Sequence, residues 1–179
     1  MTTKEKLLAL LEDSKGTFFS GEEIARTLQV SRAAVWKAVN ALREDGYTID
    51  AATNKGYRLS PDSDILSPQG IRRFLKPEYR DLDLTVLPTA PSTNALVREK
   101  ANQGRPEGCV IIACEQTDGR GRYGRQFFSP VDSGVYLSLL LRPTTYSPQQ
   151  ATCLTAAAAA AMCQAIEAVT GQQPGIKWV

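Results

Sequence analysis

The chain has 179 residues, of which 42% are hydrophobic and 22% charged, a balance typical of a soluble globular protein. Its net charge of only +2 excludes a global basic field, so any binding of nucleic acid must come from a local patch. The absence of histidine excludes a Ser-His or Cys-His catalytic pair.

The apolar runs, the N-terminal segment and the cysteines narrow the class of protein further. No apolar run approaches the length of a membrane span, and the N-terminus MTTKEKLLALLEDSK is charged and amphipathic, unlike a signal peptide. We therefore predict a cytoplasmic protein. The four cysteines show no CxxC pairing, which argues against zinc, and we expect buried thiols and no metal site; they are Cys109, Cys114, Cys153 and Cys163.

Residues 1–60 predict three short helices and a hairpin. Leucines at 7, 8, 10 and 11 give the first helix an apolar face. Ser20 and Glu23 predict a capping box at the start of the second helix, and Ser31 caps the third, which ends at Gly46. Two short helices, a tight turn and a longer helix are the pattern of a helix-turn-helix.

The outward face of the third helix carries the DNA-binding prediction. Val35, Val39 and Leu42 recur at i, i+4 and i+7 and are expected to face inward. Arginine and asparagine on the opposite face are side chains that read base edges, and Lys55 lies at the tip of the expected hairpin, or wing. The predicted DNA-binding residues are Ser31, Arg32, Ala33, Trp36, Lys37, Asn40 and Lys55.

Trp36 has two interpretations. It stacks on sugars or thymine methyl groups, or it packs against a neighbouring domain; the sequence leaves both open.

A polar, proline-bounded stretch, SPDSDILSP at 60–68, separates this module from a second region and predicts a linker at 61–70. Strand-like runs follow at 82–88, 109–114 and 134–142, and then a long helix from about 148 to 169, with Gly171 just beyond its end. We expect the alanine run at 156–161 to be the tightly packed face of that helix. Mixed strands and helices behind a helical module predict an α+β fold.

TDGRGRYGR, residues 117–125, has no explanation in folding alone. Its glycines allow backbone N–H groups to form a concave anion site, and its arginines grip carboxylate or phosphate with paired bonds. Asp118 cannot neutralise three arginines. The loop lacks the GK[ST] of a P-loop and the following helix of a dinucleotide-binding motif. It therefore predicts a site for an oxygen-rich anion such as a nucleotide phosphate, or else a mobile or RNA-binding segment.

Two more segments accompany the loop. Pro91-Ser92-Thr93-Asn94 lies between a strand and a helical pattern, where short polar side chains can cap the helix or bind a small ligand. GIKWV, near the C-terminus, places Lys177 in a strand-like setting.

Together these segments resemble the bifunctional biotin protein ligases, bacterial enzymes that also repress the biotin operon. SGEEIARTLQVSRAAVWKAVNALR, STN, EQTDGRGRYGRQFFSP and IKW carry the resemblance, in the order in which that family has them. It implies a winged helix-turn-helix at 1–60, a linker at 61–70 and a biotin ligase catalytic domain at 71–179, truncated at its C-terminus. The implied reaction joins biotin and ATP, with Mg²⁺, into biotinyl-5′-AMP and passes the biotinyl group to a lysine of the biotin carboxyl carrier protein.

The resemblance also assigns roles to residues. Lys177 and Arg122 would be catalytic, Lys177 by stabilising charge at the reacting carboxylate and phosphate. The implied biotin-binding residues are Ser92, Thr93, Asn94, Gln116, Arg120, Gly121, Arg122 and Lys177. The implied ATP- and adenylate-binding residues are Arg120, Arg122, Arg125 and Phe127. The implied partners are operator DNA, the carrier protein and a second copy of the complete protein in a homodimer, with no membrane.

The chain departs from the family pattern at three places. Phe127 stands where a family example has a tryptophan that stacks on adenine, and Tyr123 replaces a basic loop residue. The family continues beyond the KW pair, whereas this sequence stops at Val179. We therefore expect a fragment or a natural truncation that is inactive as a ligase by itself.

Two other functions remain open from the sequence. The chain is a DNA-binding regulator whose ligase-like region only senses biotin or its adenylate, or it binds single-stranded nucleic acid through the arginine-glycine loop. Biotin-dependent turnover separates the ligase from both, and salt-sensitive binding that ignores biotin indicates the last.

Overall fold

A computed structural model describes residues 1–144, 147, 150 and 152–176, without the side chains of Arg122 and Thr152. These residues form two compact units, 1–140 and 141–179, which are described separately. The predicted catalytic Lys177 lies outside the described residues.

Three helices open the chain, and a side-chain cap begins each: α1 (Thr3–Asp13), α2 (Gly21–Leu28) and α3 (Arg32–Glu44). The hydroxyl of Ser20 accepts from the Glu23 backbone N–H at 3.0 Å, and that of Ser31 accepts from the Ala34 N–H at 3.2 Å. The predicted starts of the second and third helices are thereby confirmed, although at Ser20 the structure gives only the bond to the serine hydroxyl. A complete capping box lies instead at Thr2 and Glu5, which was not predicted.

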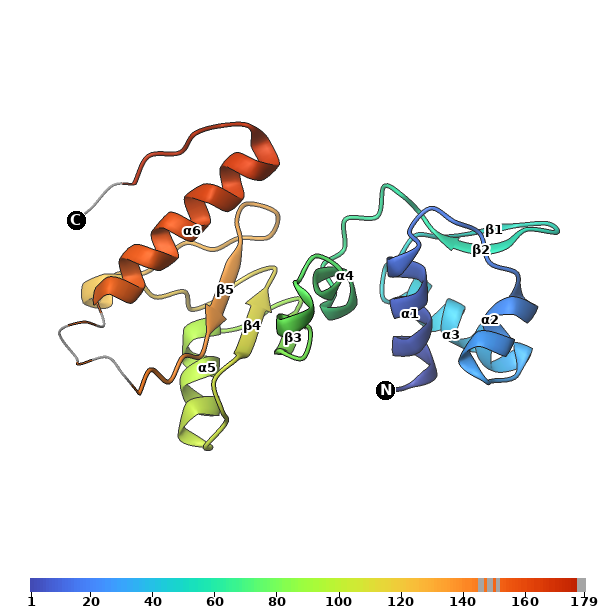
Figure 1. Ribbon diagram of the computed structural model, residues 1–179, viewed down its shortest axis with the longest axis horizontal. Helices are drawn as coiled ribbons and strands as arrows, with labels where there is room; N and C mark the ends of the chain where they lie inside the picture. The colour runs from blue at the N-terminus through green and yellow to red at the C-terminus, as the bar shows by residue number, and fades with distance from the viewer. Residues whose placement is uncertain (145–146, 148–149, 151, 177–179) are drawn as a thin grey trace. The chain divides into compact units, whose positions relative to one another are not determined.

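A hairpin follows the helices, as predicted. β1 (Ile49–Ala52) pairs antiparallel with β2 (Gly56–Leu59) in the register Ile49↔Leu59. The turn requires Gly56, because its φ is +93° and a Cβ there would lie 2.1 Å from the carbonyl oxygen of Phe19. Phe19 and Tyr57 exchange backbone hydrogen bonds of 2.9 Å. The hairpin is thus held against the segment that leads into α2, with the three helices gathered on one side of it (Figure 1).

A closed apolar core joins the helices to the hairpin. Val35, Val39 and Leu42 are at most 1% exposed, so the predicted inward face of α3 is confirmed. Other core members come from every element of the module; they include Leu7, Leu8, Leu11, Ile24, Ala38, Tyr47, Ile49 and Leu59.

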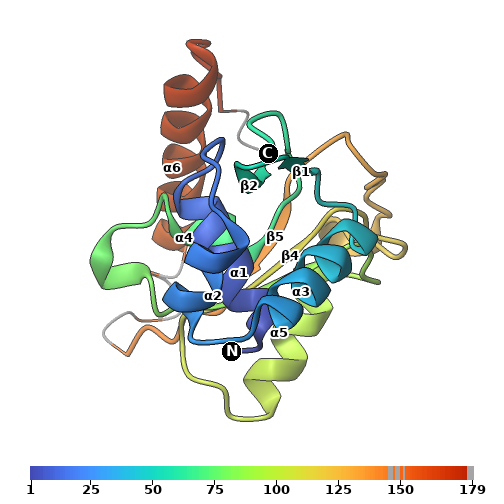
Figure 2. The same cartoon turned by 90° about the vertical axis from the view of Figure 1, so that its right-hand side faces the viewer.

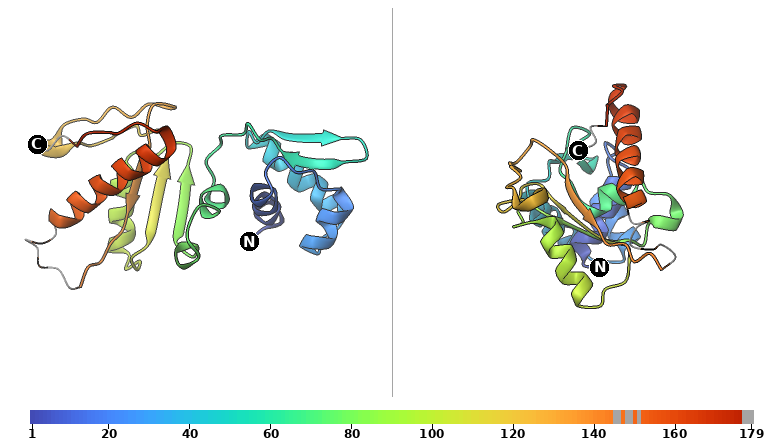
Figure 3. Two further views of the ribbon diagram at one scale, coloured as in Figure 1. Left: turned by 45° about the horizontal axis from the view of Figure 1, so that its top comes forward. Right: turned by 90° about the vertical axis from the view of Figure 1, so that its left-hand side faces the viewer.

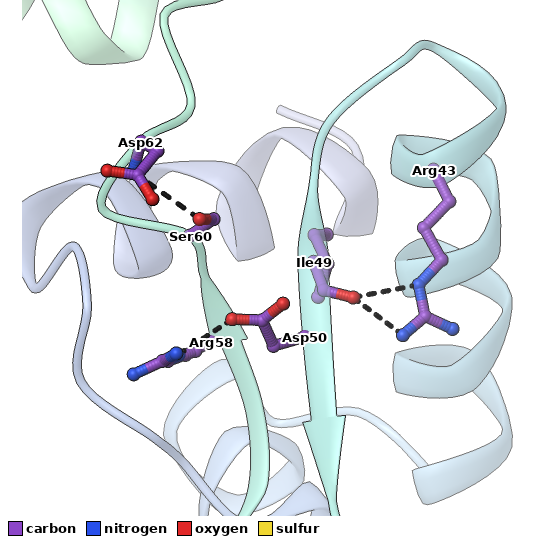
Figure 4. Close-up of polar contacts among 6 residues, drawn as sticks. All are labelled: Arg43, Ile49, Asp50, Arg58, Ser60 and Asp62. Atoms are coloured by element: carbon purple, nitrogen blue, oxygen red, sulfur yellow. Dashed lines mark hydrogen bonds and ion pairs between the residues drawn. The ribbon is translucent and has the colours of Figure 1, made fainter.

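Polar contacts fix α3 to the hairpin (Figure 4). The Arg43 guanidinium donates two hydrogen bonds to the carbonyl of Ile49, at 3.1 and 2.7 Å. Across the two strands, Arg58 donates to the Asp50 carboxylate at 2.8 Å. The C-terminal turn of α3 is therefore tied directly to the first strand of the wing.

The polar stretch after the hairpin leads to a short helix, α4 (Pro68–Arg72), and a single turn, η1 (Pro77–Tyr79). Ser67 caps α4, since its hydroxyl accepts from the Gly70 N–H at 2.9 Å. The same hydroxyl donates to the buried carboxylate of Glu12 at 3.3 Å, which ties α4 to α1. The boundaries predicted at residues 60 and 70 stay predictions.

The second region is built on a three-stranded mixed sheet of order β3-β4-β5. β3 (Asp83–Leu87) runs parallel to β4 (Cys109–Ala113), and β5 (Tyr136–Leu139) runs antiparallel to β4. α5 (Thr93–Asn102) connects the parallel pair and packs against β4 and β5 (Figure 3). The predicted α+β fold and its three strands are confirmed, although the third strand is shorter than the run at 134–142.

The two faces of this sheet are covered unequally. Val97 of α5 packs with Cys109, Ile111 and Leu140 on one face. The other face buries Leu84, Val110 and Ile112 beneath partly buried residues between Ile71 and Val86. On β5, however, Leu137 and Leu139 remain 47% and 45% exposed.

The unit from 141 onward contains α6 (Thr152–Thr170), drawn as one uninterrupted helix in Figure 2, with Gly171 at φ +68° after it. The predicted helix is confirmed, but its alanines at 156–161 are exposed or half-exposed, so the expected packed face is not seen. Its segment Cys153–Thr170 has a mean hydropathy of 1.4 and is long and apolar enough, by length and composition, to span a membrane. Among the described residues, α6 is the one helix of this kind. The sequence prediction of no such run was wrong, because a run of alanines is apolar enough to count.

The cysteines correct a second expectation. Cys109 is buried, as predicted, but Cys114 and Cys163 are half-buried and Cys153 is exposed. Cys153 and Cys163 belong to α6, whose residues are largely exposed, and this accounts for the exposure of these two. All four are free thiols.

Candidate functional site

The first cluster lies where α5 begins. Ser92 is the N-cap residue but makes no side-chain cap bond. The side-chain carbonyl of Gln116 caps the helix instead: it accepts from the Thr93 backbone N–H at 2.8 Å and from the Thr93 hydroxyl at 3.1 Å. Ser92 and Thr93 are buried, whereas Asn94 is exposed. The structure therefore joins Thr93 to Gln116 across 23 residues of sequence.

Two serines extend this cluster. The Gln116 amide nitrogen donates to the Ser129 hydroxyl at 3.1 Å, and that hydroxyl donates to the Phe127 carbonyl at 3.0 Å. The hydroxyls of Thr93 and Ser138 lie 3.0 Å apart. Neither serine was predicted from the sequence. Ser129 lies in the segment FFSP at 127–130, which has no hydrophobic periodicity from which its burial could be predicted.

The arginine-glycine loop begins beside this cluster. Phe127 N–H donates to the Gly119 carbonyl at 2.8 Å, and Gly121 N–H donates to the Arg125 carbonyl at 2.7 Å. A Cβ on Gly119 would lie 2.4 Å from the Phe127 carbonyl oxygen and 2.7 Å from the Ser129 hydroxyl, so only glycine fits. The loop therefore has a paired stem with glycine at its closest approach.

The tip of the loop is the turn η2 (Arg122–Gly124), in which Tyr123 and Gly124 have φ of +58° and +72°. Of the loop residues whose side chains the structure describes, Arg120, Tyr123, Arg125 and Phe127 are exposed, and Gly121 is half-buried. Asp118 accepts from the Arg120 guanidinium at 2.9 Å, in an ion pair whose members are both largely exposed. This pair leaves Arg120 available to an anion, because an exposed ion pair is weak.

The second cluster lies on the module of the first sixty residues. The N-cap Ser31 is exposed, as are Arg32, Ala33, Trp36 and Lys37 on α3 and Lys55 at the hairpin turn, whereas Asn40 is half-buried. A groove of about 640 Å³ runs between α3 and the hairpin. Arg32, Trp36 and Asn54 line it, among others.

Predicted residues of the helix and residues of the wing line the same groove. Trp36 is 59% exposed and lines the groove, whose other side is formed by the hairpin. Near the turn, the Lys55 ammonium lies 6.0 Å and the Arg58 guanidinium 4.7 Å from the centre of the Phe18 ring. Such cation–π contacts restrict where the wing cations point.

Comparison with known proteins connects both clusters to described families. Residues 3–58 match a helix-turn-helix domain, and residues 86–179 match the biotin/lipoate A/B protein ligase family over just more than half of the chain. The chain belongs to the biotin/lipoate A/B protein ligase family.

Its curated relatives have both parts. The bifunctional ligase/repressor BirA of Bacillus subtilis (strain 168) is 40% identical over 99% of this chain, and that of Escherichia coli (strain K12) is 32% identical over 99%. The chain spans about half the length of these relatives, 54% and 53%. A solved structure, the biotin protein ligase from Aquifex aeolicus in complex with biotin and ATP, is 28% identical over 54% of this chain and 39% of that chain, with a TM-score of 0.45.

Proposed function

We propose that this member of the biotin/lipoate A/B protein ligase family belongs to a biotin protein ligase that also represses transcription by binding DNA. The observation that carries the ligase proposal is the cluster of Thr93 and Gln116 at the stem of the arginine-glycine loop. The relatives named as bifunctional ligase/repressor, which match 99% of this chain, support it.

The cluster has the chemistry to hold the ureido ring of biotin. A ureido group offers two N–H donors and one carbonyl acceptor, and hydroxyl and amide side chains answer both kinds. Ser92, Thr93, Asn94 and Gln116 supply these groups in our proposal, and Gly121 lets the loop backbone approach the ligand. Burial of Ser92 and Thr93 strengthens their hydrogen bonds, because little water competes there.

The loop has the chemistry to hold the adenylate. Arg120, Arg122 and Arg125 would contact the phosphate through charge-assisted hydrogen bonds, and Phe127 would stack on adenine. Lys177 and Arg122 are the proposed catalytic cations, stabilising charge that develops when the biotin carboxylate attacks the α-phosphate. Mg²⁺ would enter with ATP, coordinated by oxygens of its phosphates. The described residues contain no group of three or more Cys, Asp or Glu that could hold a metal ion on its own.

The DNA-binding part of the proposal rests on α3 and the wing. Arg32 and Lys37 are exposed on α3, and Arg32 lies at the N-terminus of the helix, where the dipole favours phosphate. The groove beside Trp36 has room for backbone sugars between helix and wing. We propose that Trp36 contacts DNA there, in preference to a neighbouring domain.

The remaining partners follow from these two activities. The biotinyl group would pass to a lysine of the biotin carboxyl carrier protein, and the complete protein would bind its operator as a homodimer, since two-fold pairing joins two half-sites. We also propose a cytoplasmic location, where ATP, DNA and the carrier protein are present.

Three measurements test the proposal on the chain of 179 residues. Calorimetric titration with biotin should show binding, and desthiobiotin, which lacks the sulfur but keeps the ureido ring, should bind as well. Duplex DNA carrying candidate operators should bind with a steep dependence on salt. Pyrophosphate release with biotin and ATP measures adenylate formation. Absence of any biotin binding would contradict the ligase proposal. Binding without turnover is expected of this chain, which spans about half the length of its relatives, and it would indicate a sensor only in a protein that spans their whole length.

A further inference from the structure

The hydrogen bonds around Gln116 fix the direction of its amide from both ends. At one end, the backbone N–H of Thr93 can only donate, so the Gln116 atom that faces it at 2.8 Å must be the carbonyl oxygen. At the other end, the Phe127 carbonyl can only accept, so the Ser129 hydroxyl donates its one hydrogen there, at 3.0 Å.

The consequence is a directed chain of hydrogen bonds. Because the Ser129 hydrogen is used at Phe127, this hydroxyl presents a lone pair to Gln116, which must offer its NH₂ group at 3.1 Å. The Thr93 hydroxyl likewise donates to the Gln116 carbonyl, so it accepts from Ser138. A rotation of the amide by 180° would place donor against donor at Thr93 and lone pair against lone pair at Ser129.

We infer that Ser129 is a positioning residue, which holds the Gln116 amide in the single orientation needed for ligand and couples that orientation to the stem of the arginine-glycine loop. Ser129 is 2% exposed, so water does not replace its bonds readily. The inference rests on the proposed biotin site, and it goes beyond that site because Ser129 itself need not touch the ligand.

The same geometry explains the glycine at the base of the loop. A Cβ on Gly119 would meet Ser129 and both of its partners, at 2.7 Å from the serine hydroxyl, 2.4 Å from the Phe127 carbonyl oxygen and 3.4 Å from the Gln116 amide nitrogen. The serine, the amide and the loop stem therefore occupy one tightly packed junction.

Ser129→Ala is the direct test, since it removes both hydrogen bonds and leaves the backbone unchanged. Ser133→Ala is the matched control: it removes a nearby serine hydroxyl whose bonds go to the Pro130 carbonyl and the Tyr136 hydroxyl and not to Gln116. Both variants are compared in the full chain of 179 residues.

The first readout needs no ligand. The side-chain NH₂ of Gln116 gives a pair of proton–nitrogen NMR signals, which is identified by its disappearance in Gln116→Glu. In Ser129→Ala the signal of the proton bonded to Ser129 should shift toward the position of a solvent-exposed amide, and the Phe127 backbone N–H should exchange faster with solvent. In Ser133→Ala neither should change. An unchanged Gln116 signal in Ser129→Ala would overturn the inference, whether or not biotin binds.

The second readout is biotin affinity. Loss of one positioning hydrogen bond should weaken biotin binding by about threefold to tenfold in Ser129→Ala. In Gln116→Glu, where no NH₂ remains to be oriented, adding Ser129→Ala should cost much less, so the two effects should not add. Fully additive effects would overturn the coupling. Failure of the unaltered chain to bind biotin would instead contradict the proposed function, and the amide signals would still decide the role of Ser129.

Discussion

The helix-turn-helix module and the three-stranded sheet differ in how completely each buries its apolar side chains. In the module, Leu7, Leu11 and Leu42 are 0% exposed, and their partners come from every helix and both hairpin strands. In the sheet, the buried residues fall into two smaller groups, one on each face, and β5 exposes Leu137 and Leu139.

The two regions also differ in where their polar groups lie. The module buries Glu12 of α1, which pairs with Ser67 before α4, but it leaves Arg32, Lys37 and Lys55, on α3 and at the wing, exposed. The sheet region buries Ser92, Thr93 and Ser129, and Gln116 connects two of them, Thr93 and Ser129. Buried hydroxyls must be paired to avoid a desolvation cost, and a paired set is directional in a way that an apolar core is not. We infer that packing supports the proposed DNA-binding face of the module, whereas hydrogen-bond direction orders the ligand cluster.

The largest expected effect tests the difference in apolar burial between the two regions. Leu42→Ala should lower the free energy of unfolding of the module by about 2–5 kcal/mol, because it leaves a cavity in a closed core. Leu139→Ala should change the stability of the sheet region by no more than about 0.5 kcal/mol, since the side chain is already half-exposed. Urea titration followed by amide signals assigned to α3 and to β4 separates the two regions. Equal losses in both would contradict the difference.

A second prediction compares two glycines at which an added Cβ would clash with a backbone carbonyl oxygen. Gly56→Ala combines a clash at Phe19 with a φ of +93°, and should destabilise the module by about 1–3 kcal/mol. Gly119→Ala should leave the module intact, open the loop stem and weaken biotin binding at least about tenfold, because it displaces Phe127 and Ser129. Thermal melting and biotin titration of the same two proteins make the test.

Gly124→Ala is the control for the second change. It lies in the same loop, at φ +72°, but no atom lies within 4 Å of the position that its Cβ would take. It should strain the tip of the loop and leave the stem closed. If it weakened biotin binding as much as Gly119→Ala, close packing at the stem would not be the cause.

The two regions also differ in what their sequence could predict. The module follows local rules: Ser20 and Ser31 before apolar periods, a glycine after Leu42, and a turn residue at the hairpin tip were enough to place its elements. The strands of the sheet were found for the same reason, as short apolar runs between turn signals. Each of these signals lies within a few residues of the element that it marks.

The ligand cluster depends on contacts between distant residues and was only partly predictable. Resemblance to a family indicated Thr93 and Gln116. It did not indicate that Gln116 caps the helix that begins at Thr93, 23 residues earlier in the sequence. Ser129 and Ser138 carried no local signal, because a serine beside a proline or within an apolar strand has no period to mark it as buried. The sequence left open whether the polar side chains of residues 92–94 cap the helix or bind a ligand, and the cap comes instead from the distant Gln116.

The third prediction sharpens the division of roles within the module. Arg32→Ala should weaken binding to the preferred duplex by about 1–3 kcal/mol and alter the sequence preference, if Arg32 reads a base edge. Lys55→Ala should weaken all duplexes alike and reduce the salt slope by about 1, as expected for a phosphate contact. Gel-shift titrations over several salt concentrations test both. Glu44→Ala, at the end of α3, controls for general changes on the same helix, and an effect of neither Arg32→Ala nor Lys55→Ala would contradict the DNA-binding proposal.

The smallest effect emerges only in alkali, and it compares one ionisable group from each region. Burial, followed by the nearby Asp83 carboxylate, raises the pKa of Cys109 above its ordinary value of 9.0. Burial likewise raises the pKa of Tyr47 above 10.0, aided by Glu12 and Asp45 and opposed by its hydrogen bond with Ser67. In both cases the folded state holds the proton more tightly than the unfolded state. The stabilisation is therefore fully present below the ordinary pKa and is lost as the pH rises through the folded value.

The sheet region should accordingly begin to lose stability near pH 9, and the module only near pH 10. One proton contributes a slope of at most about 1.4 kcal/mol per pH unit. Urea midpoints measured from about pH 8 to 11 should fall less steeply above pH 9 in Cys109→Ala, and less steeply above pH 10 in Tyr47→Phe. Cys153→Ala removes an exposed thiol and should leave the alkaline slope of both regions as it is. If the urea midpoints fell as steeply in Cys109→Ala and Tyr47→Phe as in the unaltered chain, the raised pKa values of these two groups would not be the cause of the alkaline loss.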